Sequence, residues 1–399
     1  MVRRRERGAT LVLAVVGMLA LIAMAGLALD TAHVLLNKSR LQSALDAAAL
    51  AGAKGLDLTG STVVANADAS ANFGANLLPF KELKNANVTL TTQFSTTLNP
   101  FTPGGAGPYV RTSVTGFITQ MSLVQVLGIN SLNVAGNAVA GPSPPLVTAC
   151  NIVPLVVCST TAAGPPLYGY SPDQVIGLNL SAGTAGTIGP GNYGLLRLGG
   201  PGGNVLSNNL AGSFSSCATL GTTVPTQPGV VVGPVADGIN TRFNAYKAGL
   251  SATDYPPDVI NTAAHQTSLS GTGTSVTQGG TTVTTASQLT FNYANYSALR
   301  NAGTYDTQPL PGGTAAFDRR VAAVALGDCT GLASGASTIG INGFACMFLL
   351  QQLGNGANAN TIYAQVIKGC SANGQIGPGP TVLGPHKIEL YKSAGSADS

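Results

Sequence analysis

The most regular pattern along the chain is an uninterrupted apolar stretch near its beginning. From Ala9 to Leu29 the only polar side chain belongs to Thr10. An α-helix rises about 1.5 Å per residue, so about 20 apolar residues cross the roughly 30 Å hydrocarbon core of a bilayer. The stretch therefore predicts a transmembrane helix over residues 9–29. A cleaved signal peptide is the alternative, although its apolar region is normally only about 7–15 residues long.

The helical pattern continues beyond the apolar stretch. Residues 33–54 contain no proline and one glycine. Small and apolar residues recur there at heptad-like intervals, which places them on one face of an amphipathic helix. The residues of this face are Val34, Leu41, Leu45 and Ala48. Two interpretations stay open: the face binds a helix of a partner protein, or it packs against the chain's own extracytoplasmic part.

After this helix the pattern changes to short segments, most of them typical of strands. We expect a helix over 63–78, strands over 88–94, 109–118 and 131–140, a short helix over 120–128 and a loop over 99–108. The run GPSPP, residues 141–145, has the composition of a linker. Beyond it we expect strands over 151–157, 193–198, 320–326 and 339–350. The Ser/Thr/Gly-rich residues 268–290 form either a β-hairpin or an exposed insertion.

These elements predict an α+β fold class. An N-terminal transmembrane helix continues into a long amphipathic helix, and β-rich extracytoplasmic domains follow. The expected divisions are a basic cytoplasmic lead (1–8), the transmembrane helix (9–29), a helix with a small α+β domain (30–140), a Pro-rich linker (141–145) and a β-rich, cysteine-containing extracytoplasmic domain (146–399).

The charge distribution indicates how the chain is oriented in a membrane. Charged residues make up 9% of the chain, against about 25% in a typical soluble domain. Four arginines and one glutamate precede Gly8, so this lead accounts for +3 of the net charge of +4. Basic residues beside a transmembrane segment stay in the cytoplasm, so we expect a cytoplasmic N-terminus and an exported bulk. No basic patch with interleaved aromatic residues is present, which argues against nucleic acid as a partner.

All six cysteines lie after the linker: Cys150, Cys158, Cys217, Cys329, Cys346 and Cys370. An even number of cysteines in an exported domain predicts disulfides, although six cysteines allow fifteen pairings. The alternative is that several are buried free thiols.

Motifs that would support catalysis or metal binding are weak. Residues 189–194 match GxGxxG, but Pro190 lies inside the motif and a strand-like segment follows, so a turn is expected rather than a dinucleotide site. Asp57, Thr59 and Ser61 imitate a D-x-[ST]-x-S metal site, but they follow a helix instead of a buried strand. The three histidines have no metal-like spacing, and HExxH and CxxC are absent. We therefore expect no enzyme activity, no cofactor and no metal.

The N-terminal segment resembles that of TadE/TadG-like Flp (tight adherence) pilus-assembly proteins, most strongly over residues 5–140. The resemblance rests on an RG pair, an apolar span, an acidic residue after it and an LQ-x-A-x-DAAALAGA helix. The matching positions are Arg7, Gly8, Asp30, Leu41, Gln42, Ala44 and Asp46 to Ala53. It implies a structural or assembly component of a Flp/Tad pilus in the bacterial inner membrane, with its bulk periplasmic or surface-exposed. The implied partners are other pilus or secretion-apparatus proteins, in a homo- or hetero-oligomer formed through the N-terminal helix.

Two departures from the family narrow this expectation. Pilin-like members that are cleaved after a glycine carry a Glu five residues further on, where this chain has Leu13. The von Willebrand A domain of some TadG-like proteins is not recognisable. A surface or pilus-tip adhesin is the main alternative function, with cell adhesion through the Thr/Gly-rich stretch, and an envelope enzyme is a further one.

Overall fold

The computed structural model describes residues 7–80, 88–159, 164, 167–179, 192–212, 214–228, 232–247, 249–329, 337–354, 360–377 and 383–392. The chain divides into two compact units. The first comprises residues 1–56, 61–141 and 389–399, and the second comprises residues 57–60 and 142–388. The sequence-based division assigned residues 146–399 to one domain. In the structure, the C-terminal strand belongs to the first unit instead. The reason is that this strand pairs with the sheet of the first unit.

The helices of the first unit follow the expected positions. Helix α1, Arg7–Thr59, is a single helix of 53 residues. It merges the predicted transmembrane and amphipathic helices, because no proline interrupts the hydrogen-bonding ladder between them. Helix α2, Thr62–Leu77, begins where the Ser61 hydroxyl accepts the N–H of Val64, which is a common N-terminal cap.

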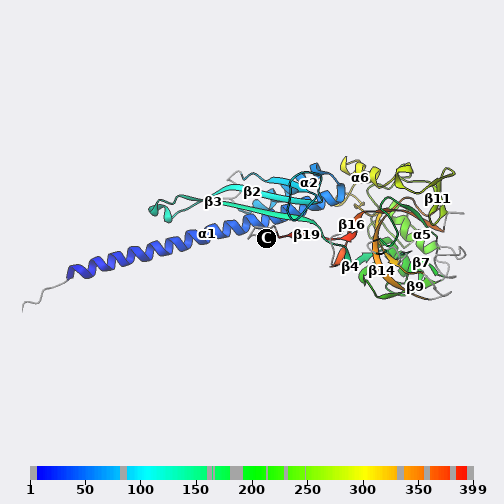
Figure 1. The fold of residues 1–399 in the computed structure, drawn as a ribbon, viewed down its shortest axis with the longest axis horizontal. Coiled ribbons are helices and arrows are strands. Elements are labelled where there is room, and N and C mark those ends of the chain that lie inside the picture. The colour runs from blue at the N-terminus through cyan, green and yellow to red at the C-terminus, as the bar shows by residue number, and fades with distance from the viewer. Residues whose placement is uncertain are drawn as a thin grey trace, which may run out of the picture. The chain divides into compact units, whose positions relative to one another are not determined.

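A four-stranded sheet completes the first unit (Figure 1). Its strands are β1 (Thr91–Ser95), β2 (Tyr109–Gln120), β3 (Ser131–Pro142) and β19 (Ile388–Tyr391), in the order β1-β2-β3-β19. Strands β2 and β3 form a long antiparallel hairpin whose end holds the short 3-10 helix η1, Val124–Leu127. Alternate β2 residues such as Val110, Thr112 and Val114 are buried, as expected of a sheet with one covered face.

The second unit is built on a central sheet that is buried on both faces. Its path is β5 (Val156–Cys158), β13 (Val321–Gly327), β14 (Thr338–Leu349), β15 (Thr361–Ile367) and β6 (Val175–Asn179), and β9 (Thr223–Pro228) with β7 (Asn192–Leu196) extends from β14. Along β14, Cys346 and Phe348 contribute to one hydrophobic core, while Ala345, Met347 and Leu349 contribute to another. Strands covered on both faces lack an apolar-polar alternation.

Different elements cover the two faces. Helices α4 (Gly203–Gly212) and α5 (Val232–Asn240) supply Leu206, Leu210, Val235 and Ile239 to one core, next to η3 (Thr241–Phe243). The other core takes residues from α6 (Tyr293–Asn301), β4 (Leu146–Ile152), β8 (Phe214–Thr219), β10 (Leu269–Thr272), β11 (Ser275–Gln278), β12 (Thr281–Val283), β16 (Gly369–Ser371) and η5 (Ala286–Gln288). Further elements are β17 (Asn373–Ile376), β18 (Gly384–His386) and η4 (Ala263–His265).

Two segments that the sequence left ambiguous are now defined. Residues 268–290 form the antiparallel meander β10-β11-β12, in which Leu269, Val276 and Val283 are buried. The segment is thus a folded part of the second unit. Of the GxGxxG match, residues 189–191 lie outside the described residues, and β7 begins at Asn192.

Candidate functional site

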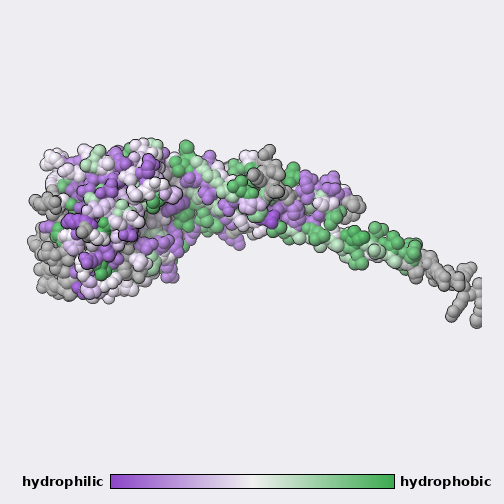
Figure 2. All heavy atoms as spheres, turned by 180° about the vertical axis from the view of Figure 1, so that it is seen from behind, coloured by the Kyte–Doolittle hydropathy of each residue, from purple (hydrophilic) through white to green (hydrophobic). Residues whose placement is uncertain are grey.

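The first half of α1 has the surface of a membrane-spanning helix. Large apolar side chains from Leu11 to Leu29 are exposed, with Leu19 61% and Leu29 63% accessible. Among the described residues, α1 is the helix that is long and apolar enough to cross a membrane. Figure 2 shows hydrophobic residues gathered along this part of the helix. Such a continuous apolar surface is stable in a bilayer and costly in water.

The second half of α1 is covered by the chain's own sheet. Leu41, Leu45 and Ala48 are fully buried, and Val34 is only half-buried. The Thr112 hydroxyl on β2 donates a 2.9 Å hydrogen bond to the Leu45 carbonyl. Three of the four residues of the predicted partner-helix face therefore lie in the core of the first unit. A partner helix would have to displace the hairpin to reach them.

Small and amide side chains explain how the helix and the hairpin come so close. The Gln42 side chain donates to the carbonyl of Asn137 on β3 at 3.0 Å and to Asp46 Oδ1 at 2.8 Å. A Cβ atom on Gly52 would lie 3.2 Å from the Cγ1 atom of Val110. The LQ-x-A-x-DAAALAGA run thus combines a hydrogen-bonding amide with residues small enough to let β-strands approach the helix.

The six cysteines form three disulfides in the second unit. The pairs are Cys150–Cys217, Cys158–Cys329 and Cys346–Cys370. The first joins β4 to β8, which are adjacent antiparallel strands. The second spans 171 residues and, in the chain-entropy account, restricts the unfolded chain most. None of the six remains free.

This pairing predicts that alkylation of the denatured, non-reduced protein labels no thiol. Reduction should lower the free energy of unfolding by about 2–5 kcal/mol for each lost disulfide. A Cys346→Ser variant is the control, because it should expose the single thiol of Cys370 to the reagent. Labelling of two or more thiols in the unaltered protein would contradict the pairing.

A buried arginine lies between the central sheet and the loops that cover it. The guanidinium of Arg320 is fully buried and donates to four backbone carbonyls, those of Leu349 (3.1 Å), His265 (2.8 Å), Ile260 (3.2 Å) and Leu350 (3.2 Å). The rings of Phe243, Phe291 and Phe348 surround it, with centroids 4.8, 5.4 and 4.5 Å from its Cζ atom. Burial lowers the pKa of Arg320 to about 10, so the group stays charged at neutral pH.

Asp258 is the buried carboxylate next to this arginine. Its Oδ2 atom accepts the backbone N–H of Arg320 at 2.9 Å and the hydroxyl of Tyr296 at 3.0 Å. Burial raises the pKa of Asp258 to about 6, although these bonds and the N–H of Ile260 favour its ionised form. Sequence reasoning missed this network, because its members are far apart along the chain.

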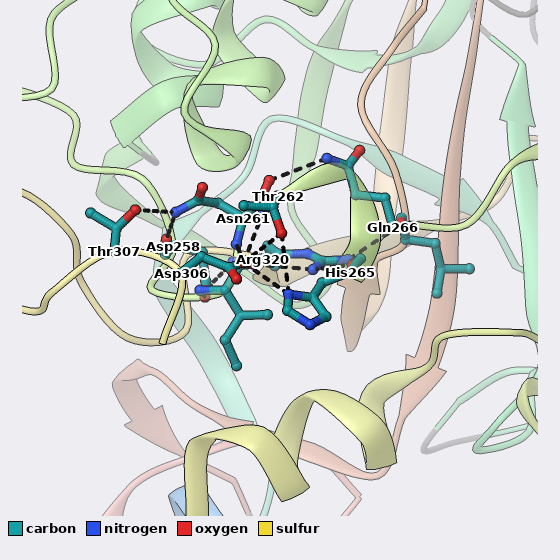
Figure 3. A network of polar contacts seen from close by, with 10 residues as sticks. Asp258, Asn261, Thr262, His265, Gln266, Asp306, Thr307 and Arg320 are labelled. Carbon is teal, nitrogen blue, oxygen red and sulfur yellow. Dashed lines mark hydrogen bonds and ion pairs between the residues drawn. The ribbon is translucent and has the colours of Figure 1, made fainter. Parts of the chain in front are cut away.

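Asp306 forms a second polar cluster that fixes the loop before η4 (Figure 3). Its Oδ2 atom accepts the N–H groups of Asn261 (2.7 Å) and Thr262 (2.9 Å) and lies 2.9 Å from Nδ1 of His265. Burial acts to raise the pKa of Asp306, but the N–H of Thr262 and the His265 side chain outweigh it, so the pKa lies below the usual value. The carboxylate thus holds the backbone of Asn261 and Thr262 and the ring of His265 in place.

The hydrogen bonds of these two clusters hold loops against the central sheet. Within the described ranges, no three His, Cys, Asp or Glu side chains are arranged to hold a metal ion. Asp57, the first residue of the D-x-[ST]-x-S imitation, lies near the end of α1, and its Oδ1 atom is 2.7 Å from Nε2 of His386. Asp57 is therefore a hydrogen-bond partner of His386 within the second unit.

Comparison with known proteins gives a match that lies within helix α1. Residues 8–55 match the sequence profile of the family described as "Putative Flp pilus-assembly TadE/G-like". No curated protein and no solved structure matches the chain. The matched range covers both the exposed apolar half of α1 and the half that the hairpin buries. Over residues 8–55 the chain is therefore similar to the TadE/G-like Flp pilus-assembly family, and the resemblance predicted from the sequence is confirmed over this segment.

Proposed function

We propose that the protein is a structural or assembly component of a Flp/Tad-type pilus or a related envelope apparatus. It is anchored in the bacterial inner membrane by α1, with a cytoplasmic N-terminus and both units on the periplasmic side or at the surface. The observation that carries the proposal is that the family match coincides with a helix that is apolar and exposed in one half and part of a folded domain in the other.

The continuity of α1 supports a structural role. The helix passes from its apolar half into the first unit without a break. Leu41 and Leu45 are fully buried against the sheet, and burying each such side chain contributes about 1.5–3 kcal/mol. The domain is thereby attached to its anchor through a packed interface instead of a flexible linker. An attachment of this kind can transmit a force or hold a partner at a fixed height above the membrane.

An adhesin would need an exposed binding segment. The Thr/Gly-rich residues 268–290 were the candidate for that role, but five of their apolar side chains contribute to the core of the second unit. We therefore favour assembly over adhesion.

The proposal predicts that a strain lacking the protein displays no surface pili, and that the full-length chain restores them. Electron microscopy of the cells measures display, and a separate assay measures attachment to a surface. In spheroplasts, protease added outside should degrade the second unit, and a cytoplasmic protein serves as the control for intact membranes. Normal pili with lost attachment would indicate the adhesin instead. Normal pili and normal attachment would exclude both functions.

A further inference from the structure

The β2–β3 hairpin follows α1 back toward its apolar half. Val110, near the start of β2, lies against Gly52, and Thr112 is bonded to Leu45. At the other end of the hairpin, a Cβ atom on Gly26 would lie 2.9 Å from the Cβ atom of Leu123. The ten residue steps of strand from Val110 to Gln120 and the 22 residue steps of helix from Gly52 to Asp30 each span about 33 Å. The hairpin is thus long enough to bring its tip, residues 121–130, beside the end of the transmembrane stretch (Figure 1).

Asp30 fixes this tip to the helix. The side chain is only 5% exposed, and its carboxylate accepts the N–H groups of Ser122 (3.2 Å), Leu123 (2.8 Å) and Val124 (2.8 Å). These are the N–H groups at the start of η1, which have no partner within that helix. A charged acceptor makes such bonds stronger than a neutral one. Asp30 is the first acidic residue after the apolar stretch, so the bond sits at the end of the span.

The tip can leave water at low cost. The Met121 N–H is bonded to the Asn130 carbonyl and the Gly128 N–H to the Gln125 carbonyl. Together with the bonds to Asp30, these contacts satisfy backbone groups that a lipid environment would otherwise penalise. No charged residue occurs between Arg111 and Asp173, so inserting the tip desolvates no side-chain charge.

The surface of the hairpin near the tip is apolar. Ile118, Leu123, Ile129 and Leu132 are between 44% and 53% exposed. They lie on the same end of the first unit as the exposed apolar half of α1, to which the tip is bonded. Four large apolar side chains grouped beside a transmembrane helix have the composition of an interfacial membrane-binding element.

We propose that the tip of the β2–β3 hairpin inserts into the interface of the membrane that α1 spans, in the leaflet facing the domain, and that Asp30 holds it there. Gly26 lies three residues before Leu29, so Leu123 sits about 4.5 Å deeper than the end of the apolar stretch. The partner of this surface is the lipid itself. The inference rests on the membrane-anchoring part of the proposed function, and it adds a second membrane contact to the single helix.

Depth-dependent fluorescence quenching tests the inference. The full-length protein, reconstituted in phosphatidylcholine vesicles, carries one nitrobenzoxadiazole label at Ile129→Cys, Thr115→Cys or Leu19→Cys, attached without reduction so that the native disulfides remain. Thr115 is an exposed position on β2, further from the tip. Lipids with a spin label near the head group should remove most of the emission at Ile129 and little at Thr115. Lipids labelled deep in the acyl chain should quench Leu19.

Each outcome has one meaning. Unquenched Leu19 would overturn the anchor and the inference together, whereas quenched Leu19 with unquenched Ile129 would overturn the hairpin inference alone. An Ile129 label that is shielded from aqueous iodide but not quenched by lipid would show that protein, such as a second copy, covers the tip. In an Asp30→Leu background the quenching at Ile129 should fall while that at Leu19 persists. Unchanged quenching at Ile129 would overturn the role assigned to Asp30.

Discussion

Arg320→Met is expected to unfold the second unit at temperatures at which the unaltered protein is folded. The substitution removes four hydrogen bonds to backbone carbonyls. The Leu350 carbonyl keeps the N–H of Thr267, but each buried acceptor that is left without a partner costs about 1–3 kcal/mol. The substitution also removes one of the positive charges that favour the ionised form of the buried Asp258 carboxylate. Removing one member of a buried charged network typically costs about 3–5 kcal/mol, a large part of a total stability of about 5–15 kcal/mol. Chemical denaturation of the oxidised protein measures the loss.

Two further variants give this prediction its controls. Lys368→Met removes a cation from an exposed position of the same unit and should change the stability by less than about 1 kcal/mol. Arg320→Lys keeps the charge, but lysine has no planar guanidinium to reach four carbonyls. The stability of this variant should therefore lie between those of Arg320→Met and Lys368→Met. Equal stability of Arg320→Met and Lys368→Met would show that the network does not hold the loops.

Leu45→Asp is expected to destabilise the first unit by about 4 kcal/mol or more, because it removes a fully buried apolar side chain and introduces a charge without a partner. Limited proteolysis and hydrogen exchange of the first unit report the loss. Val63→Asp, at a position 78% exposed on α2, makes the same chemical change on the surface and should be tolerated.

The same variant decides between the two interpretations of this helix face. Packing against the chain's own sheet predicts that stability falls first and that loss of pili follows from degradation. A stable Leu45→Asp protein that no longer supports pili would instead favour docking of a partner helix.

Features that depend on local sequence could be predicted. The apolar stretch and the absence of proline are sufficient for α1, and the β2–β3 pattern is readable because only one face of that sheet is buried. Helix α5 was not predicted, since its sequence VGPVADGIN resembles a loop. The second of its two glycines has a tertiary reason: a Cβ atom on Gly238 would lie 2.5 Å from the Ser207 carbonyl oxygen and 2.7 Å from the Cβ of Leu210, so only glycine lets α4 and α5 pack this closely.

Features that depend on distant partners could not be predicted. The presence of disulfides follows from an even number of cysteines in an exported domain, but the choice among the pairings is made by the fold, which brings Cys158 beside Cys329. In the same way, Arg320 is visible in the sequence only as a charge at the start of an apolar strand. Its acceptors lie on segments up to about 60 residues away along the chain, and nothing local indicates that the side chain points inward.

The place of β19 in the first sheet affects the order in which the protein can fold. Strand β3 ends at Pro142 and its neighbour β19 begins at Ile388, so 388 − 142 − 1 = 245 residues separate them. At about 5–20 residues per second, the ribosome needs roughly 10–50 s to make that segment. During this time one edge of β3 has no partner strand, and exposed edges favour pairing with other chains. The first unit is therefore completed only after β19, Ile388–Tyr391, has been made, and a chain that stops before this strand retains an open edge that a protease or chaperone can recognise.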